Sequence, residues 1–298
     1  MNESSKRTKS RQELQRHQRF EDVSPEVGEL DEAAVDEAMN DDPDETLALI
    51  ADLTAATDPK LRELAKRLAG RLMLDVSKRS VVRRRGLGKL VTAKYRDGGD
   101  IDIDASLAAF ENGIHHSGQR TVNIDELHVR SWEKRDTALC LLVDRSGSMG
   151  GKPLATSAVA AAAVASRQPH DYSVLAFARD VVVAKSQGAD TSSDVVVNMV
   201  LSLRGFGTTN IAQALYAASE QLSRSRAARK ITILLSDCRS NEPGDIEAAA
   251  RELDELIVIA PQDDDEEARA FGSRVGAHVV TVSGPMDVPD ALGAALDN

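Results

Sequence analysis

Five oxygen-bearing side chains stand where apolar runs of the sequence end or where helices are about to begin. They are Asp144, Ser146, Ser148, Thr209 and Asp237. Two carboxylates and three hydroxyls from separate loops form an all-oxygen ligand set, which suits a hard divalent cation such as Mg²⁺ or Mn²⁺. Because Mg²⁺ usually keeps several waters, such a site leaves a coordination position for an incoming carboxylate. The pattern therefore predicts binding through a metal ion.

The elements that must position these side chains alternate along the second half of the chain, where apolar runs are separated by stretches with helical spacing. The expected strands are 127–133, 138–143, 172–177, 181–184, 231–235, 256–259 and 279–282, and the expected helices are 152–166, 192–202, 211–223, 245–254, 265–274 and 288–296. This alternation predicts an α/β fold with a doubly wound, mostly parallel sheet, and 181–184 as its antiparallel edge. Ligands of such sheets bind beyond the carboxyl ends of the strands, where the five side chains stand.

The pattern Asp-x-Ser-x-Ser, a downstream Thr and a later strand-ending Asp resembles the metal-ion-dependent adhesion site (MIDAS) of von Willebrand factor A (VWA) domains. The resemblance covers about 135–298, and it favours Thr209 over Thr208 because Thr-Asn-Ile-Ala-Gln-Ala-Leu has the family's Thr-x-x-Ala-x-Gly/Ala-Leu spacing. It implies that the two serines and the threonine approach the cation directly, that one or both aspartates act directly or through water, and that a partner's acidic residue completes the coordination. The sequence departs from the family at Cys238, where Gly is usual, and this leaves the local turn open.

The part of the chain ahead of this region is divided by charge. Residues 1–22 are polar and predict a flexible arm or a frayed helix that cannot offset its ordering entropy by burial. The segment 23–58 carries twelve acidic residues and no Lys or Arg, whereas 60–96 carries thirteen basic residues against two acidic ones. We expect the basic stretch to pair with the acidic segment or with a partner protein in preference to nucleic acid.

Helical spacing recurs within these charged segments, at about 30–38 and 47–53. Asp58 followed by Pro59 predicts the start of a third helix. We therefore expect a mainly helical module over 23–125, followed by the VWA-like domain over 126–298.

The alternating segment Asp-Ile-Asp-Ile-Asp at 100–104 has two interpretations. It forms either a short edge strand or an extended lead-in to a helix capped by Asp104. It lacks the Gly and Glu that a calcium loop of the EF-hand type needs.

Composition excludes several other functions. The net charge of −11 and the aromatic content of 3% argue against a nucleic-acid-binding protein as a whole. Cys140 and Cys238 end apolar runs and are expected to be small core residues. The N-terminus has no apolar leader and no run is long enough to cross a membrane, so we expect a cytoplasmic protein.

Three alternative sites are weaker. The segment from Ser146 to Pro153 ends in Gly-Lys like a phosphate-binding loop, but Ser146 replaces its first Gly and Pro153 replaces the metal-binding hydroxyl. None of the six histidines has the spacing of a transition-metal site, and His115-His116 is expected to be solvated. A Ser-His-Asp triad is likewise unsupported, because no histidine is expected at a strand end beside the serines.

The charged helical segment ahead of a VWA-like domain also resembles intracellular proteins that work beside MoxR-type AAA+ ATPases, including CoxE-like proteins. It is similar as well to the C-terminal part of the D subunit of magnesium chelatase. The first resemblance implies a non-enzymatic adaptor that uses Mg²⁺, with Mn²⁺ as the alternative ion, to link such an ATPase to a client protein with an acidic residue. The second implies a non-catalytic subunit of a chelatase-like complex.

Overall fold

The computed structural model describes residues 8–79, 89–95, 100–111, 122, 124–133, 137–145, 150–203, 205 and 207–297. The chain divides into two compact units, one made of residues 1–82 and 137–298 and the other of residues 83–136. Ser146, Ser148 and the pair His115-His116 lie outside the described residues.

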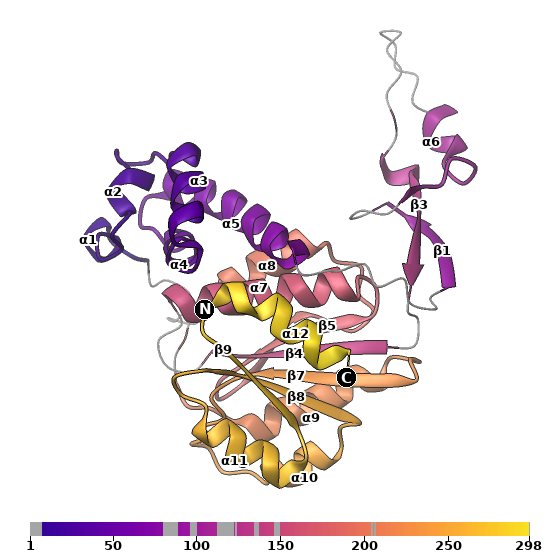
Figure 1. The fold of residues 1–298 in the computed structure, drawn as a ribbon. Helices are drawn as coiled ribbons and strands as arrows, with labels where there is room; N and C mark the ends of the chain where they lie inside the picture. The colour runs from indigo at the N-terminus through magenta and orange to yellow at the C-terminus, as the bar shows by residue number, and fades with distance from the viewer. Residues whose placement is uncertain are drawn as a thin grey trace. The chain divides into compact units, whose positions relative to one another are not determined.

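Within the described part of the larger unit, a six-stranded sheet has the order β6-β5-β4-β7-β8-β9 (Figure 1). The strands are β4 (Thr137–Asp144), β5 (Tyr172–Phe177), β6 (Val181–Lys185), β7 (Arg229–Leu235), β8 (Glu255–Pro261) and β9 (His278–Val282). Neighbouring strands pair in parallel except β5 and β6, which are antiparallel. The predicted doubly wound sheet and its antiparallel edge are therefore confirmed.

Helices cover both faces of this sheet (Figure 1). One face carries α7 (Gly151–Arg167), α8 (Ser193–Leu201) and α12 (Val288–Leu296), and the other carries α9 (Ile211–Ser223), α10 (Ile246–Arg251) and α11 (Glu266–Val275). Side chains along β4 alternate between the two faces, so Leu141 joins the apolar cluster around α7 and Leu142 joins the cluster around α9. Burial on both faces explains why the strand is apolar throughout.

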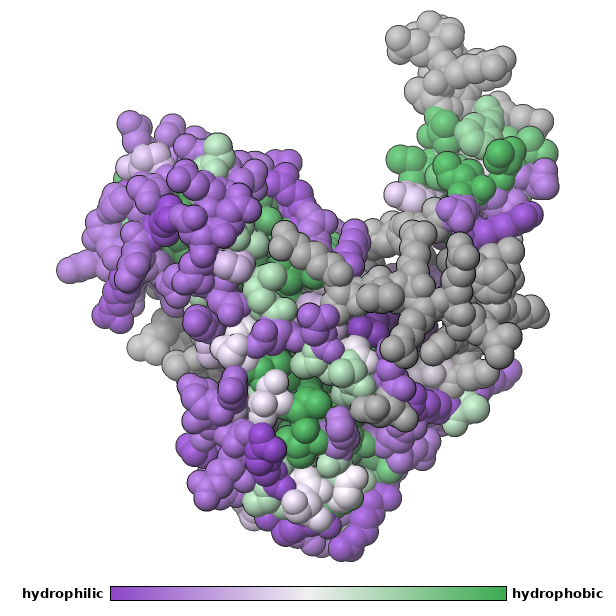
Figure 2. All heavy atoms as spheres, viewed as in Figure 1, coloured by the Kyte–Doolittle hydropathy of each residue, from purple (hydrophilic) through white to green (hydrophobic). Residues whose placement is uncertain are grey.

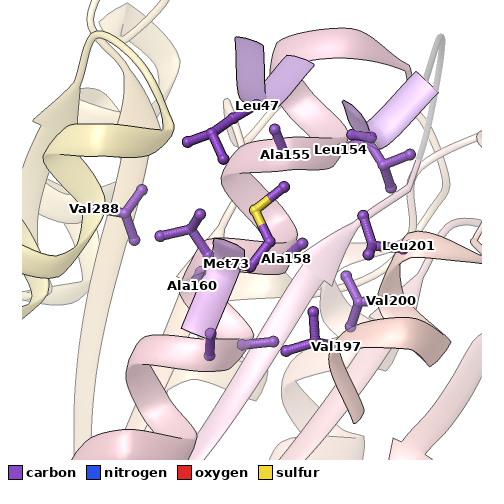
Figure 3. Packing of buried hydrophobic residues seen from close by; sticks show 14 of the residues in the cluster. Leu47, Met73, Leu154, Ala155, Ala158, Ala160, Val197, Val200, Leu201 and Val288 are labelled. Carbon is purple, nitrogen blue, oxygen red and sulfur yellow. The ribbon is translucent and has the colours of Figure 1, made fainter. Parts of the chain in front are cut away.

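A second layer of helices covers α7. This layer consists of α1 (Arg11–Leu14), α2 (Phe20–Val23), α3 (Glu32–Asp41), α4 (Pro43–Leu53) and α5 (Pro59–Arg79). Leu47 of α4 and Met73 of α5 belong to the same apolar cluster as Ala155 and Ala158 of α7 (Figure 3). The outward surface of the layer is mostly hydrophilic in the view of Figure 2. The N-terminal helices thus share one core with the sheet.

The helix starts in this layer follow the sequence signals. Asp58 Oδ1 accepts a hydrogen bond from the backbone N–H of Leu61 at 2.7 Å, which confirms the predicted start of α5. Arg71 in the basic stretch pairs with Glu32 in the acidic segment at 2.8 Å. This ion pair is one case of the expected pairing within the chain.

The prediction of a flexible arm over 1–22 is wrong for residues 8–22. Leu14 and Phe20 are buried, and Lys9 forms an isolated parallel bridge with Ala56. The burial of these side chains and the contacts of Lys9 and His17 with Asp52 offset the entropy lost on ordering this polar segment. Residues 1–7 lie outside the described residues.

In the smaller unit, the described residues include a three-stranded antiparallel sheet of order β1-β3-β2. Its elements are β1 (Lys89–Lys94), β2 (Asp100–Ile101), α6 (Leu107–Glu111), η2 (Ile124–Glu126) and β3 (His128–Glu133). Asp102 accepts hydrogen bonds from Thr92 (2.8 Å) and Arg130 (2.8 Å), and the Arg130 guanidinium above all lowers the pKa of Asp102 to about 2.

This second sheet corrects the place of one strand. The strand expected at 127–133 forms as β3, but it belongs to the small sheet. The boundary expected at 125–126 consequently does not coincide with the boundaries of the compact units. An apolar run predicts a strand and does not say which sheet the strand joins. The edge-strand interpretation of 100–104 is confirmed by β2.

Among the described residues, none of the helices combines the length and the apolar character that a bilayer crossing requires.

Candidate metal-ion site

Asp144 and Asp237 are brought together by two adjacent parallel strands. Val143 of β4 is level with Leu235 of β7, so Asp144 stands beside Ser236 at the carboxyl ends of the strands. Ser236 Oγ donates a hydrogen bond to Asp144 Oδ2 at 2.6 Å, and the same Oγ accepts one from the backbone N–H of Cys238 at 3.0 Å. Asp144 is therefore fastened to the turn that carries Asp237.

The carboxylate of Asp237 lies in an unfavourable electrostatic environment for an anion. Burial raises the pKa of Asp237, and the nearby carboxylates of Asp144 and Asp264 raise it further. The backbone N–H of Arg239, which donates to Asp237 Oδ1 at 3.0 Å, acts in the opposite direction. A divalent cation would offset both the lost hydration and the repulsion between the carboxylates, so these residues fit such an ion.

Thr209 is buried (2% exposed) just ahead of α9, and the segment that follows Asp237 holds its backbone. Its N–H donates to Asn241 Oδ1 at 2.6 Å, and its carbonyl oxygen accepts from Asn241 N at 3.2 Å and from Ser240 Oγ at 3.0 Å. The hydroxyl of Thr208 is instead bonded to the carboxylate of Glu242. One segment, 236–242, therefore fixes Asp144 on one side and Thr209 on the other.

Cys238 stands where the VWA family usually has Gly, and its backbone keeps the conformation of the turn after Asp237. Its φ is 63°, and among the described residues other than glycine it alone has a positive φ. Glycine adopts this left-handed conformation without the steric cost that Cβ introduces. The turn thus keeps a backbone conformation that favours glycine, although a cysteine occupies it.

Both cysteines are buried and free, as expected for small core residues. Burial raises the pKa of the Cys140 thiol to about 12, and burial together with the Asp237 and Asp144 carboxylates raises that of Cys238 to about 12. Neither thiol is activated as a nucleophile.

The structure brings three of the five predicted site residues, Asp144, Thr209 and Asp237, to the carboxyl end of the sheet. Ser146 and Ser148 lie outside the described residues, but the residues at both ends of their loop are described. The N–H of Arg145 donates to the carbonyl of Phe177 at 2.8 Å, and the N–H of Gly151 donates to Asp52 Oδ1 at 2.6 Å.

Sequence reasoning missed three supporting residues. Ser236, which bonds Asp144, and Asn241, which bonds Thr209, both lie within five residues of Asp237, so closeness in sequence to a predicted ligand was an available signal. Asp52 had no such signal, because it lies 99 residues from Gly151. In the described part of the chain, no group of three or more His, Cys, Asp or Glu side chains could hold an ion. A site at this edge would use hydroxyl oxygens beside its two carboxylates.

The parallel sheet with helices on both faces has the architecture of a VWA domain. The model of the family "VWA domain containing CoxE-like protein" matches residues 65–278, which is most of the chain. The chain belongs to this family. A search of curated proteins finds no match.

Several solved structures are similar to the chain. An aerotolerance-related membrane protein from Bacteroides fragilis shares 14% identity over 54% of this chain and 98% of its own, with a TM-score of 0.44. A von Willebrand factor type A protein from Catenulispora acidiphila shares 17% identity over 55% of this chain and 42% of its own, with a TM-score of 0.41. The manganese-loaded TRAP protein of Plasmodium vivax shares 17% identity over 52% of this chain and 71% of its own, with a TM-score of 0.40.

Proposed function

We propose that this protein is a cytoplasmic adaptor whose VWA domain binds a partner through a metal ion. Its ligands are Asp144, Ser146, Ser148, Thr209 and Asp237. Membership of the CoxE-like VWA family supports this function. The observation that carries it is the segment 236–242, whose hydrogen bonds join Asp144, Asp237 and Thr209 at the carboxyl end of the sheet.

The chemistry of these side chains favours Mg²⁺, with Mn²⁺ as a close substitute, because carboxylate and hydroxyl oxygens are hard ligands. The ion supplies a positive charge with a free coordination position, and the chain's own residues hold that charge at the sheet edge. An acidic side chain of the partner takes the free position. This role is binding, and we assign the protein no catalytic step.

We further propose that a MoxR-type AAA+ ATPase and a client protein with an exposed acidic residue are the two partners. The adaptor links them during assembly of a protein complex or maturation of a metal cofactor. The alternative is a non-catalytic subunit of a magnesium chelatase-like complex. Reconstitution separates the two, because only the alternative requires that the chain support insertion of Mg²⁺ or another ion into a cofactor by a chelatase-type large subunit.

Calorimetric titration of Mg²⁺ and Mn²⁺ into the metal-stripped protein tests the site. We expect saturable binding to wild type and loss of binding in Asp144→Ala, because a direct or water-mediated carboxylate ligand is removed. Asp264→Ala is the matched control, since Asp264 is a carboxylate near Asp237 that pairs with Arg239 at 2.5 Å and is no predicted ligand. Equal affinity of wild type and Asp144→Ala would show that the cation binds elsewhere.

A further inference from the structure

Asp52 of α4 joins the N-terminal helical layer to the start of α7. Its carboxylate is buried, with 6% of the residue exposed, and its Oδ1 accepts the backbone N–H of Gly151 at 2.6 Å. Its Oδ2 faces Lys9 Nζ at 2.5 Å and His17 Nε2 at 3.0 Å. One oxygen thus holds the first residue of α7, while the other is held by the segment ahead of α4.

The start of α7 depends on this distant carboxylate. The first N–H groups of a helix have no partner within the helix, and a side chain just before the helix commonly accepts one of them. Gly150 occupies that position and has no side chain. Asp52 takes over the role, and its negative charge also suits the positive end of the helix dipole.

The two glycines before and at this helix start fit the contact closely. A Cβ on Gly150 would lie 2.8 Å from Lys9 Nζ and 3.3 Å from Asp52 Oδ1. Gly151 has a φ of +54°, which L side chains rarely adopt. The backbone at Gly150 and Gly151 therefore lies close to the Asp52–Lys9 pair, with no room for a side chain at Gly150.

We infer that Asp52 is a positioning residue for the metal site, because it holds Gly151, which lies three residues after Ser148 in the sequence. The inference rests on the proposed function. On the N-terminal side of Ser146, the chain is held by β4 and by the bond from Arg145 N to the Phe177 carbonyl. Residues that orient metal ligands without touching the ion affect its affinity strongly.

This role makes the helical layer a functional part of the metal site. A ligand or partner that shifts α4 would weaken cation binding, and cation binding would in turn stabilise the contact of α4 with α7, because such coupling is reciprocal.

Asp44 provides a matched control on the same helix. Its Oδ1 accepts the backbone N–H of Met286 at 2.9 Å, in the short helix η3 (Pro285–Asp287) that follows β9. Asp44 and Asp52 therefore make the same kind of bond from α4 to the part of the chain that carries the sheet. Met286 is distant in sequence from all five predicted ligands, and Gly151 lies three residues after Ser148.

The test is calorimetric titration of Mn²⁺ into the full chain as wild type, Asp52→Ala, Asp52→Asn and Asp44→Ala. We expect the affinity of Asp52→Ala to fall about 10- to 100-fold, the range typical for residues behind metal ligands. Asp52→Asn keeps an oxygen that can accept the Gly151 N–H and should recover most of this loss. Asp44→Ala should bind Mn²⁺ like wild type. Its melting temperature should fall, because the bond to Met286 is lost.

The outcomes separate this inference from the proposed function. If wild type binds no Mn²⁺, both are overturned. If wild type binds and Asp52→Ala binds equally well, or if Asp44→Ala loses as much affinity, only the positioning role of Asp52 is overturned.

Hydrogen exchange of the wild-type protein supplies a second measurement in case Asp52→Ala does not fold. Saturating Mg²⁺ should slow amide exchange in peptides around Asp52 and Gly151, and should leave peptides around Met286 unchanged. Protection that reaches Gly151 but does not extend to the peptide around Asp52 would contradict the coupling.

Discussion

The helices α7 and α9 follow two of the three segments that form the candidate metal site, yet the starts of these helices are capped in opposite ways. On its own face of the sheet, α9 begins with a local cap, because Asn210 Oδ1 accepts the N–H of Gln213 at 3.0 Å, and it turns Tyr216 toward solvent (43% exposed). The start of α7 is capped by Asp52 from 99 residues away. The start of α9 is therefore capped by a sequence neighbour, and the start of α7 by a separate layer of helices.

Burial follows the same division. In α7, the run from Ala158 to Ala165 is buried throughout, although this helix lies on the outside of the sheet. A helix that is apolar on all sides must be covered on all sides. The N-terminal layer supplies that cover through α4 and α5, whereas α9 keeps an exposed polar side.

The largest predicted effect tests this difference in burial between α7 and α9. Ala160 is 1% exposed in the cluster that α7 shares with α4 and α5. Ala160→Glu buries a charge without a partner, and we expect it to lower the free energy of unfolding by at least about 3 kcal/mol or to prevent folding. Urea denaturation followed by circular dichroism measures the loss.

The matched control places the same residue type on the other face. Gln213 of α9 is exposed, so Gln213→Glu should change the free energy of unfolding by no more than about 0.5 kcal/mol. Similar losses in both variants would mean that α7 is no more enclosed than α9.

The same contrast shows how far the sequence predicts the molecule. The elements from β4 onward lie within a few residues of their expected bounds, because apolar runs and helical spacing are local signals. Asp144 and Asp237 could likewise be placed, since parallel strands end at a common edge.

The remaining features depend on contacts between distant residues. The order of residues 8–22 rests on contacts with helices further along the chain, among them the burial of Leu14 and Phe20 and the ion pair between Lys9 and Asp52. The role of Asp52 depends on its proximity to Gly151, which no spacing indicates. One local signal was nevertheless present: the run Ala-Val-Ala-Ala-Ala-Ala-Val-Ala in α7 has no polar face and indicates a covering layer.

The second prediction sharpens the comparison on the α9 face of the sheet, at the turn that carries Asp237. Cys238 packs in the cluster of the α9 face and holds a φ of 63°. A β-branched residue is a clear outlier in that conformation, so Cys238→Val should be less stable than Cys238→Gly by about 1–3 kcal/mol, although valine buries more apolar surface. Denaturation midpoints of the two variants measure the difference. A valine variant as stable as the glycine variant would show that the turn has changed its conformation.

The smallest predicted effect is a pH dependence of stability. It concerns His17, which contacts Asp52 in the helical layer that caps α7. His17 places Nδ1 2.7 Å from Glu45 Oε1 and Nε2 3.0 Å from Asp52 Oδ2. Because a neutral imidazole has only one N–H, both contacts are satisfied together only when the ring is protonated. The bond to Asp52 in particular raises the pKa of His17, and Glu45 adds to it, against an opposing effect of burial.

The sign of the pH dependence follows from that shift. A raised pKa in the folded state means that protonated His17 stabilises the fold fully below its unfolded pKa of about 6.5 and loses this contribution as the pH rises through the folded value. Burial opposes ionisation of Asp52, but the bonds from His17, Lys9 and Gly151 outweigh it and lower the pKa of Asp52, so this carboxylate stays charged in the same interval. Wild type should therefore exceed His17→Gln in stability by up to about 1 kcal/mol at pH 6, with a smaller difference at pH 8.5. Urea titrations at both pH values measure it, and a difference that grows with pH would contradict the protonated ring between Glu45 and Asp52.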